Sequence, residues 1–209
     1  MTYTQTAPSP RYLALMEQYK SMHQEGDRLN DLAPEQTFQG VSLGAHVGAI
    51  KMMIDRSGSR SLLDYGCGKA EGYEKMSMRT PDGREIRGLK AIWGIADIRL
   101  YDPCYLPFCA RPEGQFDTVI STDVLEHCPE EDLEWIVSDI FGFSRKAVFC
   151  SVALYPAHKK LPTGENAHVT LQSAGWWFDL FERTKRAHGG RKYFLAVCRG
   201  AKDFAFVEG

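Results

Sequence analysis

The stretch best suited to hold a ligand joins a predicted strand to a glycine turn. Residues 61–70 read Ser-Leu-Leu-Asp-Tyr-Gly-Cys-Gly-Lys-Ala, so Asp64 follows a short apolar run and precedes two glycines. Glycine turns allow main-chain N–H groups to come close to a ligand. Open α/β sheets bind their ligands at the carboxyl ends of their strands. The pattern predicts a binding site at Asp64, although an ordinary strand-to-helix turn would use the same glycines.

These residues resemble the first motif of the class I S-adenosylmethionine-dependent methyltransferases, hydrophobic-hydrophobic-Asp-x-Gly-x-Gly-x-Gly. Ala70 replaces the third glycine of that motif, which narrows the turn without filling it. The competing nicotinamide fingerprint, G-x-G-x-x-G, fits less well because Glu71 stands at its third glycine. The resemblance implies S-adenosylmethionine as cofactor, S-adenosylhomocysteine as product, and cofactor contacts from Asp64, Tyr65, Gly66, Cys67 and Gly68.

A second acidic residue, Asp102, ends the predicted strand 98–101 and precedes Pro103. It resembles the acidic second motif of the family, whose carboxylate can accept hydrogen bonds from both ribose hydroxyls of the cofactor. Its distance from Asp64 exceeds the roughly 20 residues usual in such units, which predicts an insertion at about 79–95. A plainer interpretation is that Asp102 only begins the Asp-Pro turn. We predict that Asp102 and Pro103 bind the cofactor.

The third stretch, residues 116–127, reads Phe-Asp-Thr-Val-Ile-Ser followed by Thr-Asp-Val-Leu-Glu-His. It is similar to the fourth motif of the family, in which a strand leads into a turn beside the methionine and sulfonium of the cofactor. The resemblance implies cofactor contacts from Thr122, Asp123 and Val124. For residues 125–127 it implies that they orient this turn.

Methyl transfer from a sulfonium is an in-line displacement, so the protein must align a nucleophile with the methyl carbon and exclude water. A hydroxyl or ammonium nucleophile also needs a base. We predict His168 and Asp123 as the catalytic residues, because histidine titrates near neutral pH and both are expected near the mouth of the site. Tyr155 and His46 are further candidates. His168 could equally hold its loop in place, and Asp123 could bind an amino group.

The sequence offers no carboxylate or histidine cluster with the spacing of metal ligands. We therefore predict no metal site.

Alternating helical and strand patterns predict an α/β fold. Gly189-Gly190 is a two-residue turn signal, which predicts a hairpin of 185–188 with 192–199, whereas 103–115 contains no clear strand. The resemblance implies a Rossmann-like class I methyltransferase fold, with a mostly parallel central sheet, a C-terminal antiparallel hairpin and flanking helices. We divide the chain into a tail and helix at 1–40 and a single methyltransferase domain at 41–209. Helices are predicted at 11–24, 41–56, 71–78, 128–142 and 174–183, and strands at 61–65, 98–101, 116–121 and 147–152.

Composition limits the partners and the compartment. The 209 residues carry a formal net charge of -2, which gives no electrostatic support for a nucleic-acid partner, although a local basic patch would be hidden in the total. None of the 6 cysteines forms a C-x-x-C pair, and no signal peptide or membrane-length apolar run is evident. We expect a cytoplasmic protein with a small-molecule substrate and no membrane association, present as a monomer or homodimer.

The predicted function is methyl transfer from S-adenosylmethionine to an oxygen or nitrogen of a small molecule or biosynthetic intermediate. Residues 122–125 lack the Asn/Asp/Ser-Pro-Pro-aromatic tetrapeptide of adenine and cytosine amino methylases, so a nucleic-acid or tRNA methyltransferase is an alternative with less support. The same residues are also compatible with a non-catalytic relative that binds cofactor as a partner subunit, and with a nicotinamide oxidoreductase built on the same sheet.

Overall fold

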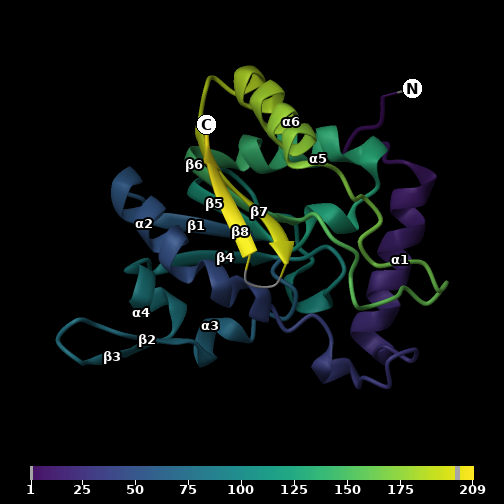
Figure 1. Ribbon diagram of the computed structural model, residues 1–209, viewed down its shortest axis with the longest axis horizontal. Helices are drawn as coiled ribbons and strands as arrows, with labels where there is room; N and C mark the ends of the chain where they lie inside the picture. Colours follow the sequence, from purple (N-terminus) through teal and green to yellow (C-terminus); the bar gives the residue numbers. More distant parts are fainter. Residues whose placement is uncertain (1, 201–202) are drawn as a thin grey trace.

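The computed structural model describes residues 2–200 and 203–209. Its centre is a six-stranded sheet in the order β4-β1-β5-β6-β7-β8 (Figure 1), in which the first five strands are parallel and β8 runs antiparallel to β7 at the edge. The predicted α/β class, with a mostly parallel central sheet and an antiparallel C-terminal strand pair, is confirmed. The strands of the sheet are β1 Ser61–Tyr65, β4 Asp97–Tyr101, β5 Phe116–Thr122, β6 Ser144–Ala153, β7 Lys192–Gly200 and β8 Asp203–Glu208.

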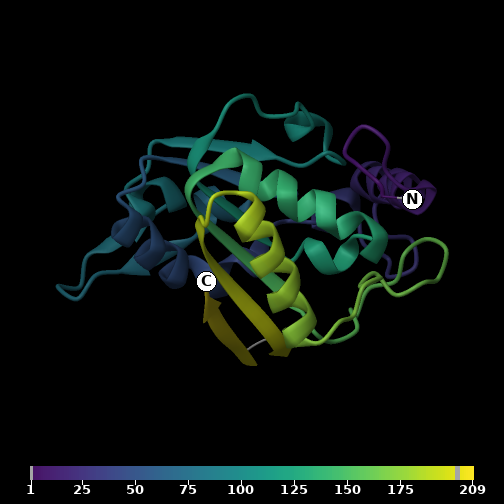
Figure 2. The same ribbon diagram turned by 90° about the horizontal axis from the view of Figure 1, so that it is seen from above.

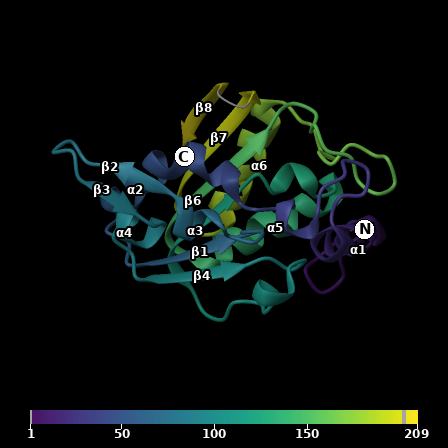
Figure 3. The same ribbon diagram turned by 90° about the horizontal axis from the view of Figure 1, so that it is seen from below.

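Helices cover both faces of this sheet. Successive strand residues point to opposite faces, so Leu63 packs in the core beneath α5 and α6, while Leu62 packs beneath α2 and α4. Figure 2 shows the face covered by α5 and α6, and Figure 3 shows the opposite face, covered by α2 and α4. The bounds of these helices are α2 Val47–Ser57, α3 Gly72–Lys75, α4 Leu89–Trp93, α5 Glu130–Phe143 and α6 Ala174–Ala187.

The strand order reverses between β1 and β5. From β1 the chain adds β4 on one side and then β5 on the other. Parallel register pairs Tyr65 with Tyr101 and Thr122 with Ser151, so the carboxyl ends of β4, β1, β5 and β6 reach one edge of the sheet together. A switch point of this kind is where open α/β sheets bind their ligands.

The C-terminal hairpin lies farther along the chain than the sequence predicts. Residues 185–187, predicted as part of its first strand, form the end of α6. Gly189-Gly190 ends that helix, and the N–H of Gly190 donates to the carbonyl of Lys185 at 3.0 Å. Glycines with positive φ often end helices in this way. Gly189-Gly190 therefore ends a helix, and its predicted role as the turn of the hairpin is wrong. The antiparallel pair is β7 with β8, and β7 itself runs parallel to β6.

The insertion predicted before the second strand of the sheet is a small hairpin. β2 (Ser77–Arg79) pairs antiparallel with β3 (Glu85–Arg87), and the two project from the body of the molecule in Figure 1. The helix predicted at 71–78 is therefore shorter. It ends at Lys75, because Met76 is already extended and leads into β2.

The N-terminal helix α1 (Pro10–Glu25) lies beside the carboxyl ends of the parallel strands (Figure 1). At its start, the N–H of Ser9 donates to the carboxylate of Asp132 at 2.9 Å. Leu15 and Met22 are buried in a cluster with residues of the loop 153–172. The division at residue 40 stays a prediction, but α1 is packed onto the rest of the chain. Within the described residues, no helix is long and apolar enough to cross a membrane.

Candidate functional site

A cavity of about 450 Å³ opens at the carboxyl ends of β4, β1 and β5. Its volume suits a small-molecule site. Residues of α1, segment 36–43 and the loop 153–172 form its walls. His168 and every residue predicted to bind the cofactor line this cavity, and their individual roles stay predictions. The predicted cofactor residues are Asp64, Tyr65, Gly66, Cys67, Gly68, Asp102, Pro103, Thr122, Asp123 and Val124.

The main-chain donors of the glycine turn are already used within the protein. The N–H groups of Gly66 and Cys67 donate to the carbonyl of Tyr101. The N–H of Gly68 donates to Oδ2 of Asp102 at 2.9 Å. The absence of side chains at these glycines leaves space in the cavity, but the N–H groups of the turn are not free. The expectation that these N–H groups approach a ligand is therefore wrong. Gly66 has a φ of +85°, and a Cβ there would lie 2.4 Å from Cγ2 of Val124. Glycine is required because the turn after β5 approaches so closely.

Segment 37–40 lies across this glycine turn. The carbonyl of Phe38 accepts from the N–H of Lys69 at 2.7 Å, and that of Gln39 accepts from Glu71 at 3.1 Å. A Cβ at Gly68 would lie 2.3 Å from the carbonyl oxygen of Phe38. The second glycine is thus required by contact with the N-terminal part of the chain, which forms one wall of the cavity.

The carboxylate of Asp64 is buried with one oxygen unpaired. Asp64 is 2% exposed, its Oδ2 accepts a hydrogen bond from the Tyr73 hydroxyl at 2.8 Å, and its Oδ1 has no partner in residues 2–200 and 203–209. Burial raises the pKa of Asp64 to about 7 because the charged form loses its hydration, whereas the hydrogen bond from Tyr73 lowers it. An unpaired buried oxygen is costly, so a donor from a bound ligand would stabilise it.

Asp102 faces the same cavity from the end of β4. Its Oδ2 accepts from the N–H of Gly68 and its Oδ1 from the N–H of Cys104, both at 2.9 Å. Each carboxylate oxygen has two lone pairs, so each can still accept from a ligand. Asp102 therefore organises the turn that follows it, as the plainer interpretation expects, and it also borders the cavity, where its binding of the cofactor stays a prediction.

The turn after β5 holds Asp123 in an unusual conformation. Asp123 has a φ of +60°, in the left-handed region that non-glycine residues rarely adopt. Its N–H donates to Oγ of Ser151 at 3.1 Å. Glu126, in the 3₁₀ turn Leu125–His127, accepts from the N–H of Ala153 at 2.6 Å. These bonds to the end of β6 fix the turn so that Asp123 borders the cavity, and the orienting role predicted for Glu126 agrees with them.

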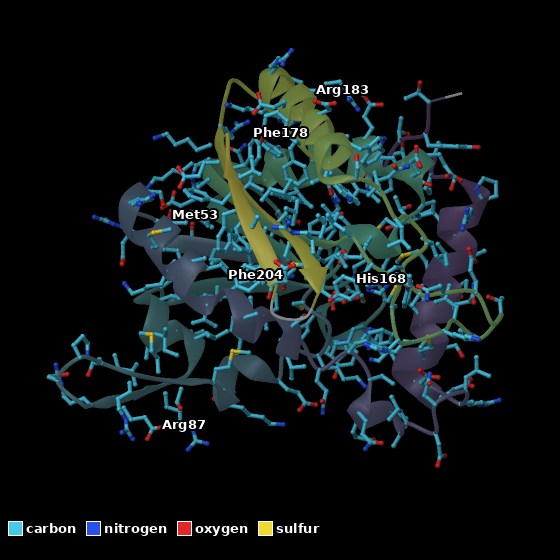
Figure 4. The ribbon with its side chains drawn as sticks, in the orientation of Figure 1. Met53, Arg87, His168, Phe178, Arg183 and Phe204 are labelled. Atoms are coloured by element: carbon cyan, nitrogen blue, oxygen red, sulfur yellow. The ribbon has the colours of Figure 1, made fainter. Side chains whose placement is uncertain are left out.

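His127 and His168 meet Asp123 at the mouth of the cavity. One nitrogen from each ring and one carboxylate oxygen lie within 4.8 Å of one another. Figure 4 shows His168 between the strand ends and α1. Nδ1 of His168 lies 2.6 Å from the carbonyl of Tyr155, and Nδ1 of His127 lies 2.8 Å from that of Ala167. Because carbonyls only accept, these contacts assign the proton of each neutral ring to Nδ1 and a lone pair to Nε2. Burial lowers the pKa of His127 to about 4.

This cluster corrects the expectation that the chain lacks a group with metal-ligand spacing. Asp123 and His127 are four residues apart in one turn, whereas His168 comes from the loop after β6. Parallel packing of β5 and β6 brings the two segments together, which spacing along the chain does not reveal. His127 is the clearest omission from the predicted site. The resemblance gave His127 only a role in orienting its turn, and its position four residues after Asp123 was the further signal in the sequence.

The remaining base candidates, Tyr155 and His46, separate in the structure. Tyr155 lines the cavity. His46 lies outside its lining, between the rings of Phe149 and Phe204, whose centroids are 5.5 and 5.3 Å away. His46 is therefore a core residue, and its candidacy as a base is wrong. Tyr73, which had no predicted role, is a neighbour of Asp64 that sequence spacing alone did not single out.

Three thiols line the cavity without chemistry of their own. Burial raises the pKa of each, so they stay protonated and are poor nucleophiles. They belong to Cys67, Cys104 and Cys128.

No protein-family model and no curated protein matches the sequence. Among solved structures, the chain is similar to magnesium protoporphyrin IX methyltransferase (ChlM) from Synechocystis PCC 6803 with bound SAH. The TM-score is 0.48, the sequence identity is 13%, and the match covers 94% of each chain. A likeness this distant does not show the function of this chain.

Proposed function

We propose that this protein binds S-adenosylmethionine in the cavity and transfers its methyl group to an oxygen or nitrogen of a small molecule or biosynthetic intermediate. The observation that carries the proposal is the buried carboxylate of Asp64, which has one unpaired oxygen and lines the cavity. Asp102 lines the same cavity from the neighbouring strand. Two carboxylates on adjacent strand ends suit a ligand with several hydroxyl or amino donors.

The residues present fit this cofactor. S-adenosylmethionine carries hydroxyl donors on its ribose and amino donors elsewhere, and its sulfonium supplies an activated methyl group. Asp64 and Asp102 would accept from such donors, while Thr122, Asp123 and Val124 would border the rest of the molecule. The glycine turn supports binding through the space it leaves, because its own N–H groups are engaged.

A nicotinamide dinucleotide fits this site less well. Its pyrophosphate is usually held at a helix N-terminus by free main-chain N–H groups. Here the helix after the glycine turn is α3, which begins at Gly72 and has only 4 residues. The N–H groups of Gly66 and Gly68 already donate to Tyr101 and Asp102. These two features favour adenosylmethionine over the oxidoreductase alternative.

Catalysis would depend on alignment, exclusion of water and removal of a proton from the acceptor. Tyr12 and Tyr19 of α1 give the cavity an aromatic wall, which limits access of water. Nε2 of His168 carries a lone pair that can accept the proton, because Nδ1 donates to the carbonyl of Tyr155. The carboxylate of Asp123 would stabilise the imidazolium that forms.

The finer parts of the proposal rest on expectation. A small-molecule acceptor, a cytoplasmic location and a monomeric or homodimeric state stay predictions. A nucleic-acid or tRNA acceptor, or a non-catalytic role as a partner subunit, is an alternative that no contact in the cavity specifically favours.

Calorimetric titration with S-adenosylhomocysteine tests the proposal, with NAD and NADP as comparison ligands. We expect binding of the homocysteine compound alone, and its loss in Asp64→Asn. Asp97→Asn, which changes an exposed aspartate at the opposite end of β4, should bind like the wild type. Equal binding by Asp64→Asn in a folded state, or preferential binding of NAD or NADP, would contradict the proposal. If S-adenosylhomocysteine binds as expected, a screen for methyl transfer from labelled S-adenosylmethionine would identify the acceptor.

A further inference from the structure

The cluster at the mouth of the cavity has the composition of a metal site. Asp123 contributes a carboxylate, and His127 and His168 each contribute an imidazole. Two imidazoles with one carboxylate form a common ligand set for catalytic divalent transition metals, which keep further positions open. The three donors come from two segments, so their convergence is a product of the fold.

Both imidazoles are held as metal-ligating histidines usually are. Such a histidine donates its other ring N–H to a carbonyl or carboxylate, which fixes the tautomer and the ring orientation. Nδ1 of His127 lies 2.8 Å from the carbonyl of Ala167, and Nδ1 of His168 lies 2.6 Å from that of Tyr155. Within residues 2–200 and 203–209, neither Nε2 has a hydrogen-bond partner, although both rings line the cavity.

The surrounding contacts keep the two rings in place. The main-chain N–H of His168 donates to Oδ1 of Asn166 at 2.9 Å, and the Tyr19 hydroxyl lies 2.9 Å from Nδ1 of His127. The two imidazoles meet edge to face, with centroids 4.8 Å apart and an interplanar angle of 83°. Asp123 is exposed at its end of the cluster, so its side chain has room to adjust.

We propose that Asp123, His127 and His168 form a binding site for one divalent transition-metal ion, such as Mn²⁺, Co²⁺ or Zn²⁺. The donor atoms lie within 4.8 Å of one another. Bond lengths of about 2.0–2.2 Å at such ions require them to approach more closely. Rotation of the exposed Asp123 carboxylate toward the two rings supplies part of this movement. Imidazole donors favour Co²⁺ and Zn²⁺ over Ca²⁺ and Mg²⁺, which select oxygen ligands, and the carboxylate of Asp123 also suits Mn²⁺.

A metal at this position changes the chemistry expected of the cavity mouth. His168 then acts as a ligand and no longer as the proton acceptor. A bound ion would hold an oxygen or nitrogen of the acceptor at an open coordination position and would make its proton more acidic, so that the proton could pass to water. This consequence rests on the proposed methyl transfer, whereas metal binding itself does not, so the two can fail separately.

Calorimetric titration of the metal-free 209-residue chain with MnCl₂ tests the site, without any adenosyl compound. We expect one ion per chain, and an affinity for Mn²⁺ lower by more than about 10-fold in each of Asp123→Asn, His127→Ala and His168→Ala. Even the loss of a residue that only hydrogen-bonds to a metal ligand lowers metal affinity by about 10-fold. Titration with CoCl₂ should give the same stoichiometry and absorption bands that disappear in the three variants.

Asp123→Asn keeps the inference testable if either histidine variant fails to fold, because asparagine preserves the side-chain shape and tolerates a positive φ. The control is His188→Ala, which removes an imidazole whose Nε2 lies 2.8 Å from Oγ of Ser138, outside the cavity lining. It should bind Mn²⁺ like the wild type. Absence of Mn²⁺ and Co²⁺ binding by the folded wild type, or unchanged affinity in Asp123→Asn, overturns the inference and leaves His168 as the candidate base.

Discussion

The hydroxyl of Tyr73 donates a 2.8 Å hydrogen bond to Oδ2 of Asp64, and in the described part of the chain no other group pairs with this buried carboxylate. Tyr73 also packs edge to face on Trp93, with ring centroids 5.9 Å apart. The interaction therefore ties α3 and α4 to the end of β1. Burial opposes ionisation of Asp64 and the hydrogen bond favours it, which leaves this residue able to titrate near neutral pH.

The stability of the protein should depend on pH through Asp64. The unfolded chain ionises Asp64 near 3.8, whereas the folded protein keeps the proton until its pKa of about 7 is reached. Between these values the folded state binds more protons, so the contribution of Asp64 to the free energy of unfolding is complete below about pH 4 and is lost as the pH rises to about 7. Asp64→Asn removes this titration.

Urea denaturation of the wild type and Asp64→Asn measures the effect. The free energy of unfolding of the wild type, relative to the variant, should fall by up to about 1.4 kcal/mol per pH unit across this interval and level off above it. Parallel curves for the two proteins would show that the carboxylate does not titrate there.

Removing the Tyr73 hydroxyl should make Asp64 harder to ionise. Tyr73→Phe deletes the hydrogen bond that lowers the pKa of this carboxyl, so its titration should move to higher pH. If the ionised carboxylate binds the cofactor, the pH at which S-adenosylhomocysteine affinity reaches half its maximum should rise with it. Calorimetric titrations over a pH series measure this midpoint. An unchanged midpoint, with reduced affinity at every pH, would point to a purely steric role for Tyr73.

A methyl group at Gly66 should separate the two turns that border the cavity. The Cβ of Gly66→Ala would lie 2.4 Å from Cγ2 of Val124, and the φ of +85° is strained for alanine. We expect a loss of about 1–3 kcal/mol in the free energy of unfolding and a loss of S-adenosylhomocysteine binding. The matched control is Gly48→Ala in α2, where a Cβ would meet nothing within 4 Å and alanine favours the helix. Similar behaviour of the two variants would contradict this account.

The sheet and the cofactor edge could be predicted because their determinants are local. Asp64 lies near the carboxyl end of β1 and Asp102 directly follows β4. Parallel strands place their carboxyl ends together, so two separate motifs imply one site. The hairpin could not be positioned, because Gly189-Gly190 suits a helix end as well as a β-turn. The position of the hairpin depends on which strand pairs with β6, and that pairing is decided by tertiary packing.

The groups that sequence analysis missed are held by contacts between distant segments. His127 faces the cavity beside His168 because the turn after β5 and the loop after β6 pack together. The N–H groups of the glycine turn looked available, yet one of them donates to Phe38, which precedes the turn by about thirty residues. A motif reports which residues a turn contains, but not which neighbours have already used its donors.

The docking of α1 should control both stability and the cavity wall. Leu15 is 3% exposed and packs in the cluster that includes Leu161 of the loop 153–172, and it also lines the cavity. Leu15→Ala removes buried methyl groups on one side of this contact, so we expect a loss of about 2–5 kcal/mol in the free energy of unfolding and weaker S-adenosylhomocysteine binding. Leu13→Ala, on the same helix but 54% exposed, should change stability by less than about 0.5 kcal/mol. Denaturant unfolding and calorimetry on both variants measure these effects. A different outcome is that Leu15→Ala lowers the affinity for S-adenosylhomocysteine while the cooperative unfolding of the remaining chain is unchanged. It would mean that α1 detaches locally and that its packing matters more for the cavity than for the stability of the fold.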